Sequence, residues 1–455
     1  MQRERLKSRL GFILLSAGCA IGIGNVWKFP YMAGQYGGGI FVLIYLFFLL
    51  TMGVPAMTME FALGRAAQKS PVKLYQQLEK PGQKWHIHGY FAYVGNIILM
   101  MFYTTVAGWM LSYFISTMQG VFSGLDSAGI AAEFGSLVAN PQKMMFYTAL
   151  VIVVSFGVCS IGLQNGLERV TKVMMIALLA IMAILAVNSI FLDGGKEGLE
   201  FYLMPDINKM RDAGIINVIV GAMNQAFFTL SVGIGSMAIF GSYIGKDRSL
   251  LGEAVNVAVL DTFVAFTSGL IIFPACFAYN VDVNSGPDLI FITLPNVFNN
   301  LPFGRLWGSL FFVFMTFAAL STVFAVFENI ISCTMDLFGW SRKKACLINC
   351  IVMIVLSIPC VLGFNVLKNI KPLGEGSNIM DLEDFVVSNV LLPLGSLVFV
   401  LFCTVRYGWG WKNFIKEANE GKGLKVANWM RGYMTYVLPI IIFIIFALGV
   451  YNIFK

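Results

Sequence analysis

Two short glycine-rich stretches are the parts of the sequence best suited to bind small charged species. The first covers residues 18–25 (GCAIGIGN), inside an apolar run that extends from Leu10 to Tyr36. The second covers residues 229–235 (TLSVGIG) and places two hydroxyls beside the same Gly-Ile-Gly triplet. Because glycine destabilises the interior of a helix, we expect both stretches to interrupt helices and to free backbone groups for other partners.

The freed backbone groups suggest which species could bind. Carbonyls near Gly18, Ala20 and Ile21 would be hard oxygen ligands for a small cation, and N–H groups at the start of a half-helix favour an anionic group such as a carboxylate. Unsatisfied amides are costly in lipid, so the breaks need such partners. The alternative is that the glycines only allow close helix packing. The second Gly-Ile-Gly triplet favours a binding site at the membrane midplane, of the kind that transporters use.

The composition indicates an all-α polytopic membrane protein. Hydrophobic residues make up 58% of the chain and charged residues 12%, and the mean hydropathy is +0.78. A spanning helix needs roughly 20 apolar residues, which predicts eleven transmembrane helices and a single domain over residues 1–455. The predicted helices begin near Leu10, Ile40, Tyr90, Met144, Val170, Ile215, Leu251, Phe303, Leu347, Leu382 and Tyr433.

The positive charges predict the orientation. With the N-terminus inside, 22 of the 31 Lys and Arg residues lie in cytoplasmic segments and 8 lie outside. We therefore expect a multi-pass protein of the cell's inner (plasma) membrane with a cytoplasmic N-terminus and an external C-terminus. The net charge of +7 follows from this topology and leaves no domain for nucleic-acid binding. Two histidines, His86 and His88, and cysteines without metal-type spacing indicate that the protein is not an enzyme.

Seven short motifs resemble the signature of the neurotransmitter:sodium symporters, a family that includes the bacterial leucine transporter. They are residues 24–31 (GNVWKFPY), 37–39 (GGG), 60–65 (EFALGR), 166–169 (GLER), 227–231 (FFTLS), 318–322 (AALST) and 341–343 (SRK). The resemblance implies two five-helix repeats of inverted topology, residues 10–192 and 213–405, with helices 1 and 6 broken. A cytoplasmic loop and the eleventh helix would follow in residues 406–455.

The resemblance also implies two sodium ions. The first site would use the Ala20 carbonyl, Asn25, Thr229, Asp261 and the carboxylate of the substrate. The second site would use five residues that supply carbonyls or hydroxyls, namely Gly18, Ile21, Ala318, Ser321 and Thr322. An oxygen shell suits a hard cation. Each hydroxyl could instead bond a carbonyl one turn earlier in its own helix.

The implied substrate is an amino acid. Gly22 stands where monoamine carriers have an aspartate that pairs with an amine, so a substrate carboxylate can approach the first sodium ion and Tyr103. Ile234 and Val326 replace bulkier residues of the leucine transporter, which favours a large aliphatic or aromatic side chain. The expected substrate-binding residues are Cys19, Ala20, Gly22, Ile23, Gly24, Leu99, Tyr103, Phe228, Thr229, Ser231, Ile234, Thr322 and Val326.

Asp261 is an ionisable residue inside a predicted span, where a charge is costly and indicates function. Many relatives have Asn here. In chloride-dependent relatives, chloride lies near residues matching Tyr45, Gln225 and Thr229 and a Ser that matches Ala265. Because Ala265 has no hydroxyl and Asp261 supplies a negative charge, we expect chloride-independent transport. Protonation of Asp261 would also allow proton antiport.

Further residues match the gates and supports of the family. The outer pair would be Lys28 and Asp384, with Lys in place of the usual Arg. The inner pair would be Arg3, or its rival Arg5, with Asp336. Tyr243 and Glu328 would lie nearby. Two departures affect the inner side, since Leu6 stands where a tryptophan is expected and Ile176 where a proline is expected. Glu60, late in the second predicted span, should accept hydrogen bonds from amides freed by the two breaks.

Together these expectations describe a sodium-coupled symporter that imports a hydrophobic or aromatic amino acid by alternating access. Its partners would be the amino acid, sodium and the lipid bilayer. Two alternatives remain at this point, a proton-coupled amino-acid transporter and an amino-acid sensor that does not transport. The sequence does not identify the amino acid or the oligomeric state.

Overall fold

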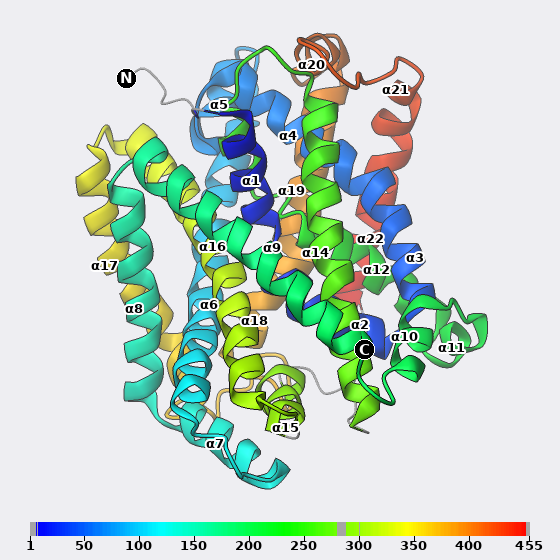
Figure 1. Ribbon diagram of the computed structural model, residues 1–455. Helices are drawn as coiled ribbons and strands as arrows, with labels where there is room; N and C mark the ends of the chain where they lie inside the picture. The colour runs from blue at the N-terminus through cyan, green and yellow to red at the C-terminus, as the bar shows by residue number, and fades with distance from the viewer. Residues whose placement is uncertain (1–5, 7, 280–287, 300, 452–455) are drawn as a thin grey trace.

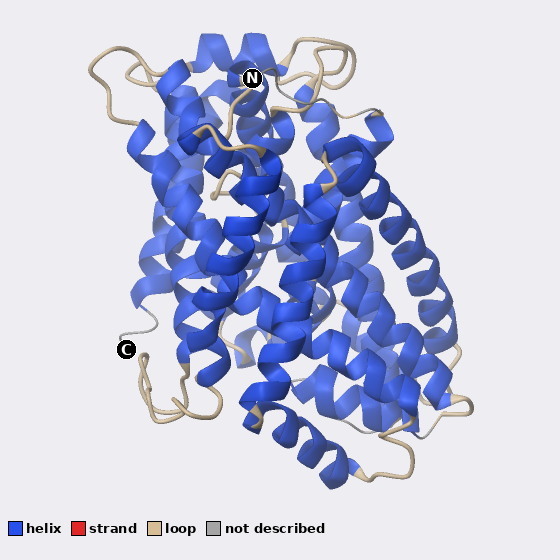
Figure 2. Cartoon of the chain, turned by 90° about the vertical axis from the view of Figure 1, so that its left-hand side faces the viewer, coloured by secondary structure: helices blue, strands red, loops and turns tan. Residues whose placement is uncertain are grey.

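The computed structural model describes residues 6, 8–279, 288–299 and 301–451. Its regular elements within those ranges are helices, and the only strand-like pairings there are isolated bridges, Gly38 to Pro205 and Arg248 to Lys422. The long helices run side by side, and the loops gather at the two ends of the bundle (Figure 2). This is the all-helical architecture that the composition predicts.

Nine helical segments in the described part of the chain are long and apolar enough to cross a membrane. They are Gly39–Ala67, His86–Gln119, Pro141–Ser160, Leu163–Ile190, Leu250–Ala278, Gly304–Phe338, Arg342–Leu362, Ile379–Thr404 and Met430–Tyr451. A tenth is the bent pair Arg9–Ala20 and Gly24–Gln35. The remaining predicted span, near Ile215, is α12 (Ile215–Thr229) followed after a break by α13 (Ser236–Gly241), and neither piece alone is long enough to count.

The spans are built from α-helices and from π-helical turns, labelled η. The α-helices within spans are α1 (Arg9–Ala20), α2 (Phe29–Gln35), α3 (Gly39–Phe48), α4 (Val54–Ala67), α6 (His86–Gln119), α8 (Pro141–Ser160), α9 (Arg169–Ile190), α14 (Leu250–Ala278), α16 (Gly304–Phe338), α17 (Arg342–Leu362), α18 (Ile379–Phe385), α19 (Leu392–Thr404), α21 (Met430–Gly432) and α22 (Leu438–Tyr451). The π-helical turns within spans are η1 (Gly24–Lys28), η2 (Leu49–Gly53), η3 (Leu163–Glu168), η5 (Val386–Leu391) and η6 (Tyr433–Val437). A sixth, η4 (Leu289–Thr293), lies in the shorter helix Leu289–Asn299 outside the spans.

The connecting helices lie at opposite ends of the bundle. In Figure 1, α5 (Pro71–Leu78) and α20 (Trp411–Ala418) lie at the end where α1 begins. At the other end lie α7 (Ser127–Ala139), α10 (Lys196–Leu203), α11 (Ile207–Asp212) and α15 (Leu294–Asn299). Between the ends, α16 packs against α6, α9 and α1, so the broken first helix borders the centre of the core.

Proline explains most of the π-helical turns. Five of the six end two residues before a proline, and those prolines are Pro30, Pro55, Pro295, Pro393 and Pro439. Proline lacks an N–H, and its ring clashes with the carbonyl four residues earlier. A widened turn directly before the proline relieves that clash without ending the helix. The exception, η3, follows Gly162, whose φ of +114° only glycine adopts readily.

Candidate functional site

Both glycine-rich stretches break their helices, and the two breaks touch. α1 ends at Ala20, helical structure resumes at Gly24, and the two segments are bent by 56°. After Thr229 the chain turns through Ser231, Gly233 and Gly235, which all have positive φ, before α13 begins. The Ser231 hydroxyl donates to the Cys19 carbonyl at 3.1 Å. The breaks expected from the sequence are therefore present and adjacent.

Buried polar side chains replace the hydrogen bonds lost at the breaks. The Ile23 N–H donates to the Tyr103 hydroxyl oxygen at 2.9 Å, and Asn96 donates to the Ile234 carbonyl at 2.7 Å. The Gly233 N–H donates to a carboxylate oxygen of Glu60 at 2.5 Å. Glu60 was expected to accept hydrogen bonds from amides of both breaks, and this bond comes from the second break.

One cluster of oxygens joins the first break to α16. The Thr322 hydroxyl lies 3.2 Å from the Gly18 carbonyl oxygen and 3.3 Å from that of Ile21. The Ser321 hydroxyl lies 3.2 Å from the Ile21 carbonyl oxygen and 2.9 Å from that of Ala318. The structure thus brings together all five residues expected at the second sodium site. Their ligand atoms are all oxygens, as a hard cation prefers.

A second cluster surrounds Asp261, whose side chain is fully buried. Asn25 donates through its amide nitrogen to Asp261 at 2.7 Å and to Thr229 at 3.0 Å, and its amide oxygen accepts from the Gly22 N–H at 3.0 Å. Thr229 donates to Asp261 at 3.0 Å, and the Tyr45 hydroxyl lies 3.4 Å from the same carboxylate. Three residues of the expected first sodium site therefore meet here, and the fourth, Ala20, lines the adjacent cavity.

A small cavity, called the central cavity below, lies between the two breaks. Its volume is about 20 Å³, room for about one water molecule. It is lined by Cys19, Ala20, Gly22, Gly24, Leu99, Tyr103, Phe228, Ser231, Ile234, Thr322 and Leu392. An amino acid would have to enlarge it, so the site is closed in this conformation.

The lining includes most of the expected substrate-binding residues, and three of them lie elsewhere. Ile23 lines a cavity further out, Thr229 is engaged with Asp261, and Val326 is fully buried away from the lining. Leu392 is the one lining residue that the sequence reasoning missed. No signal in its own segment marks it, because an apolar residue in a span is ordinary core by default.

Gly22 has no room for a side chain. A Cβ atom at this position would collide with the hydroxyls of Tyr103 and Thr322. The residue therefore keeps the backbone of the first break in contact with both hydroxyls. It also leaves the cavity without an acidic side chain at the position where an amine-binding aspartate stands in monoamine carriers.

The expected outer pair is formed. Lys28 Nζ lies 3.4 Å from Asp384 Oδ2 and 4.0 Å from the centre of the Phe228 ring. Two cavities of about 260 and 320 Å³, called the outer cavities below, are both lined by Lys28, Tyr31, Phe228 and Asp384. Phe228 lines the central cavity as well, and Gly24 and Tyr103 line both the central cavity and the first outer cavity, so these three residues lie between them.

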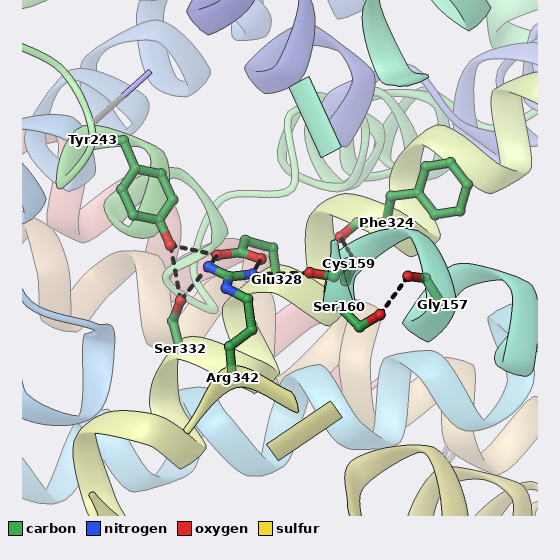
Figure 3. A network of polar contacts seen from close by, with 8 residues as sticks. All are labelled: Gly157, Cys159, Ser160, Tyr243, Phe324, Glu328, Ser332 and Arg342. Atoms are coloured by element: carbon green, nitrogen blue, oxygen red, sulfur yellow. Dashed lines mark hydrogen bonds and ion pairs between the residues drawn. The ribbon is translucent and has the colours of Figure 1, made fainter. Parts of the chain in front are cut away.

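A buried ion pair closes the opposite side (Figure 3). Glu328 is fully buried, and its carboxylate accepts from Tyr243 at 2.7 Å and from two Arg342 nitrogens at 2.7 and 2.9 Å. Tyr243 and Glu328 meet as expected, and Arg342 is a partner that the sequence reasoning did not assign. The signal was present, because an acid inside a span needs a cation and Arg342 is the second residue of the SRK motif.

The expected inner pair falls partly outside the described residues, and the described start of the first helix is held by further contacts. Arg3 and Arg5 lie outside the described residues, and Asp336 accepts from the Ser70 N–H at 2.8 Å. In the described part, Ser8 donates to Glu168 at 3.1 Å, and Arg9 pairs with Glu253 at 2.9 Å. Leu6, where a tryptophan was expected, packs against the core, and Ile176 is half-exposed on the fifth span.

Comparison with known proteins decides the family. The sequence model of the sodium:neurotransmitter symporter family matches residues 3–124 and 132–455. The chain belongs to this family. The symporter is 33% identical over 441 residues to the sodium-dependent transporter YhdH of Bacillus subtilis (strain 168), and the match covers 96% of both chains. It is 31% identical over 458 residues to a sodium-dependent transporter of Haemophilus influenzae, and that match covers 98% of both.

A solved structure of the same family matches the fold. MhsT, crystallised in complex with L-phenylalanine, is 36% identical and superposes with a TM-score of 0.88, covering 98% of this chain and 100% of its own. The resemblance read from the sequence motifs is thereby confirmed. This symporter is a sodium-dependent multi-pass membrane transporter and not an enzyme.

Proposed function

We propose that this symporter imports a hydrophobic or aromatic amino acid together with two sodium ions, by alternating access and without chloride. The observation that carries the proposal is the grouping of two oxygen clusters around one closed cavity. Ten of the residues expected to contact substrate line that cavity. The co-transported ions and the amino acid would share the space between the two helix breaks.

The two clusters suit sodium to different degrees. The second set, Gly18, Ile21, Ala318, Ser321 and Thr322, presents five oxygens that could turn toward an ion without rebuilding the backbone. The first set needs one change. Asn25 directs its amide nitrogen at Asp261, so a flip of the amide would have to bring its oxygen toward a sodium ion beside Thr229 and Asp261. The flip would give up the hydrogen bond that this oxygen now accepts from the Gly22 N–H.

The substrate would bind with its carboxylate toward the first sodium ion and the Tyr103 hydroxyl, and with its side chain against Leu99, Phe228 and Ile234. This apolar wall supports a large aliphatic or aromatic side chain. MhsT was crystallised with L-phenylalanine, and the similarity of the two chains supports the same class of substrate here. Leucine and tryptophan are the other side chains we would test first.

Alternating access requires one gate to open while the other stays closed. In this conformation the outer cavities reach Phe228, and the Glu328–Arg342 pair holds the opposite side together. We therefore assign the structure to a closed-inside state in which the Lys28–Asp384 pair and the Phe228 ring lie over the central cavity. Each sodium charge that crosses a potential of 100 mV supplies about 2.3 kcal/mol, so two supply roughly 4.6 kcal/mol for a zwitterionic substrate.

Asp261 supports chloride independence. Its buried carboxylate lies beside Tyr45 and Thr229, the residues that match chloride contacts in chloride-dependent relatives. A fixed negative charge there would do what chloride does in those relatives. Ala265, buried in the same helix, adds no hydroxyl. If Asp261 binds a proton when sodium leaves, the return step would also carry protons outward.

For the topology we propose eleven spans, counting α12 and α13 as one broken helix, and two inverted repeats over residues 10–192 and 213–405. The end of the bundle with α5 and α20 would face the cytoplasm, because the Lys-rich and Arg-rich loops belong to it. The N-terminus would then be cytoplasmic and the C-terminus external, in the inner (plasma) membrane.

Uptake into proteoliposomes tests the proposal. Radiolabelled amino acids are supplied outside, with an inward sodium gradient and then with choline in place of sodium at constant pH. We expect sodium-dependent accumulation of a hydrophobic or aromatic amino acid. Uptake that follows the proton gradient and ignores sodium would replace the proposal with proton coupling, and sodium-dependent binding without accumulation would replace it with a sensor.

A further inference from the structure

The central cavity has one lining residue from a helix that carries none of the residues expected to contact substrate. Leu392 is the first residue of α19, and it is 3% exposed. The remaining lining residues come from the two breaks, from α6, from the end of α12 and from α16. We propose that the side chain of Leu392 limits the size of the substrate side chain that this symporter accepts. This inference rests on the proposed function.

A pair of glycines brings α19 against the second break. A Cβ atom at Gly395 would collide with the Gly233 carbonyl, and one at Gly233 would collide with the Leu392 carbonyl. Gly233 also has a φ of +105°, which other residues rarely adopt. The two backbones can approach this closely because neither position has a side chain. The approach places Leu392 next to Ile234 in the cavity wall.

The π-helical turn before Leu392 sets the direction in which it faces. Asp384 and Ser388, earlier in the same span, both contact Lys28 of the first helix. In a regular α-helix a residue eight positions after Asp384 would be rotated by about 80° from it. The one additional residue in η5 reduces that offset to roughly 20°. Leu392 therefore points to the same side of its span as Asp384, which contacts Lys28. That side faces the central cavity, which Leu392 lines.

The rest of the wall explains why this position has control over size. Tyr103 and Thr322 are held by hydrogen bonds to Ile23 and Ile21 of the first break, and the hydroxyls of both lie against Gly22. Phe228 also lines both outer cavities. The apolar wall then consists of Leu99, Ile234 and Leu392. Of these, Leu392 lies directly after the π-helical turn η5, a kind of turn that is frequent at functional sites.

The test compares substrate selectivity among variants at this position. Wild type, Leu392→Ala and Leu392→Phe are reconstituted, and sodium-driven uptake is measured for valine, leucine, phenylalanine and tryptophan. One methylene changes selectivity by about tenfold or more, so Leu392→Ala should raise the ratio of tryptophan to valine uptake efficiency about tenfold. Leu392→Phe should lower it by a similar factor. The sodium dependence should stay that of wild type, because no sodium ligand is changed.

Leu397→Ala is the matched control. Leu397 lies in the same helix, is partly buried, and is not among the residues that line the central cavity. The Leu397→Ala variant loses the same side-chain atoms as Leu392→Ala, and its substrate selectivity should remain that of wild type. If Leu392→Ala fails to fold, Leu392→Phe and Leu392→Met carry the comparison. The ligand-induced rise in melting temperature in detergent then supplies the ranking of substrates.

The outcomes separate this inference from the proposed function. Absence of sodium-dependent uptake or binding of any amino acid by wild type would remove the proposed function. Normal wild-type uptake, with ratios in the Leu392 variants within twofold of wild type, would overturn the role of Leu392 and leave the proposed function standing. The same holds if Leu397→Ala shifts the ratio as much as Leu392→Ala.

Discussion

The amide nitrogen of Asn25 lies 2.7 Å from a carboxylate oxygen of Asp261, although the two residues are 236 positions apart in the sequence. This hydrogen bond connects the first break to α14, and the acid that accepts it is fully buried. A buried acid of this kind is retained at a cost in stability. Its charge is therefore the first feature to test.

Replacement of Asp261 by Asn should make transport depend on chloride when a hydroxyl is added nearby. We expect Asp261→Asn to weaken half-maximal sodium activation about tenfold, which corresponds to about 1.4 kcal/mol. In the double variant Asp261→Asn/Ala265→Ser, chloride should restore activity because it can supply the missing negative charge. Uptake in chloride and in gluconate measures this. A wild type that loses uptake in gluconate would contradict chloride independence.

The Glu328–Arg342 pair should stabilise the closed-inside state. Its nitrogen and oxygen lie 2.7 Å apart, and the two side chains are 14% and 0% exposed for Arg342 and Glu328. Removal of one partner of such a pair costs about 3–5 kcal/mol. We expect Arg342→Gln and Glu328→Gln each to lower the melting temperature and the uptake rate. The double variant should recover part of the melting temperature, and purely additive losses would argue against the pairing.

The outer gate should tighten when Lys28 becomes Arg. Lys28 and Asp384 are partly exposed and 3.4 Å apart, so the present pair contributes about 1 kcal/mol or less. Arginine can bind a carboxylate through two parallel hydrogen bonds. In Lys28→Arg we expect a lower KM and a lower maximal uptake rate, each by a few-fold, because closure is favoured and reopening is slowed. Higher values of both would mean that the pair does not act in closure.

Gly22→Ala should abolish uptake while leaving the fold intact. The added methyl group collides with the hydroxyls of Tyr103 and Thr322 beside the central cavity. Gly157→Ala is the matched control, because a Cβ atom at Gly157 in α8 meets open space. We expect the control to retain wild-type uptake. The two variants are compared by uptake and by size-exclusion behaviour in detergent, and normal uptake by Gly22→Ala would contradict the placement of the substrate.

Glu60→Ala should prevent folding or transport. Glu60 is 1% exposed and accepts the N–H of Gly233 at the second break. Loss of the acceptor leaves a buried amide unsatisfied, at a cost of about 1–3 kcal/mol. Glu60→Gln keeps an acceptor oxygen and should retain part of the activity. Expression yield, melting temperature and uptake distinguish these cases, and wild-type behaviour of Glu60→Ala would show that the break needs no such acceptor.

The sequence by itself determined the class, the broken helices and most of the residues that line the central cavity. Apolar composition leaves few soluble alternatives, and the glycine triplets destabilise helices wherever they lie in a span. The motif residues Gly18, Ile21, Ser321 and Thr322 could be assigned together, because their spacing is specific to one family. The pairing of Lys28 with Asp384 could be assigned for the same reason.

Only the tertiary structure decided which apolar residues reach the cavity and which charged side chains pair. An apolar residue in a span has the same sequence signal whether it faces lipid, core or substrate, so Leu392 was missed and Val326 was expected in a wall that it does not line. The direction of Leu392 depends on a π-helical turn and on the close contact of Gly233 with Gly395. The Arg9–Glu253 pair joins segments that are 244 positions apart, and the Arg342–Glu328 pair joins the consecutive helices α16 and α17. Both pairings depend on how the helices pack in the folded chain.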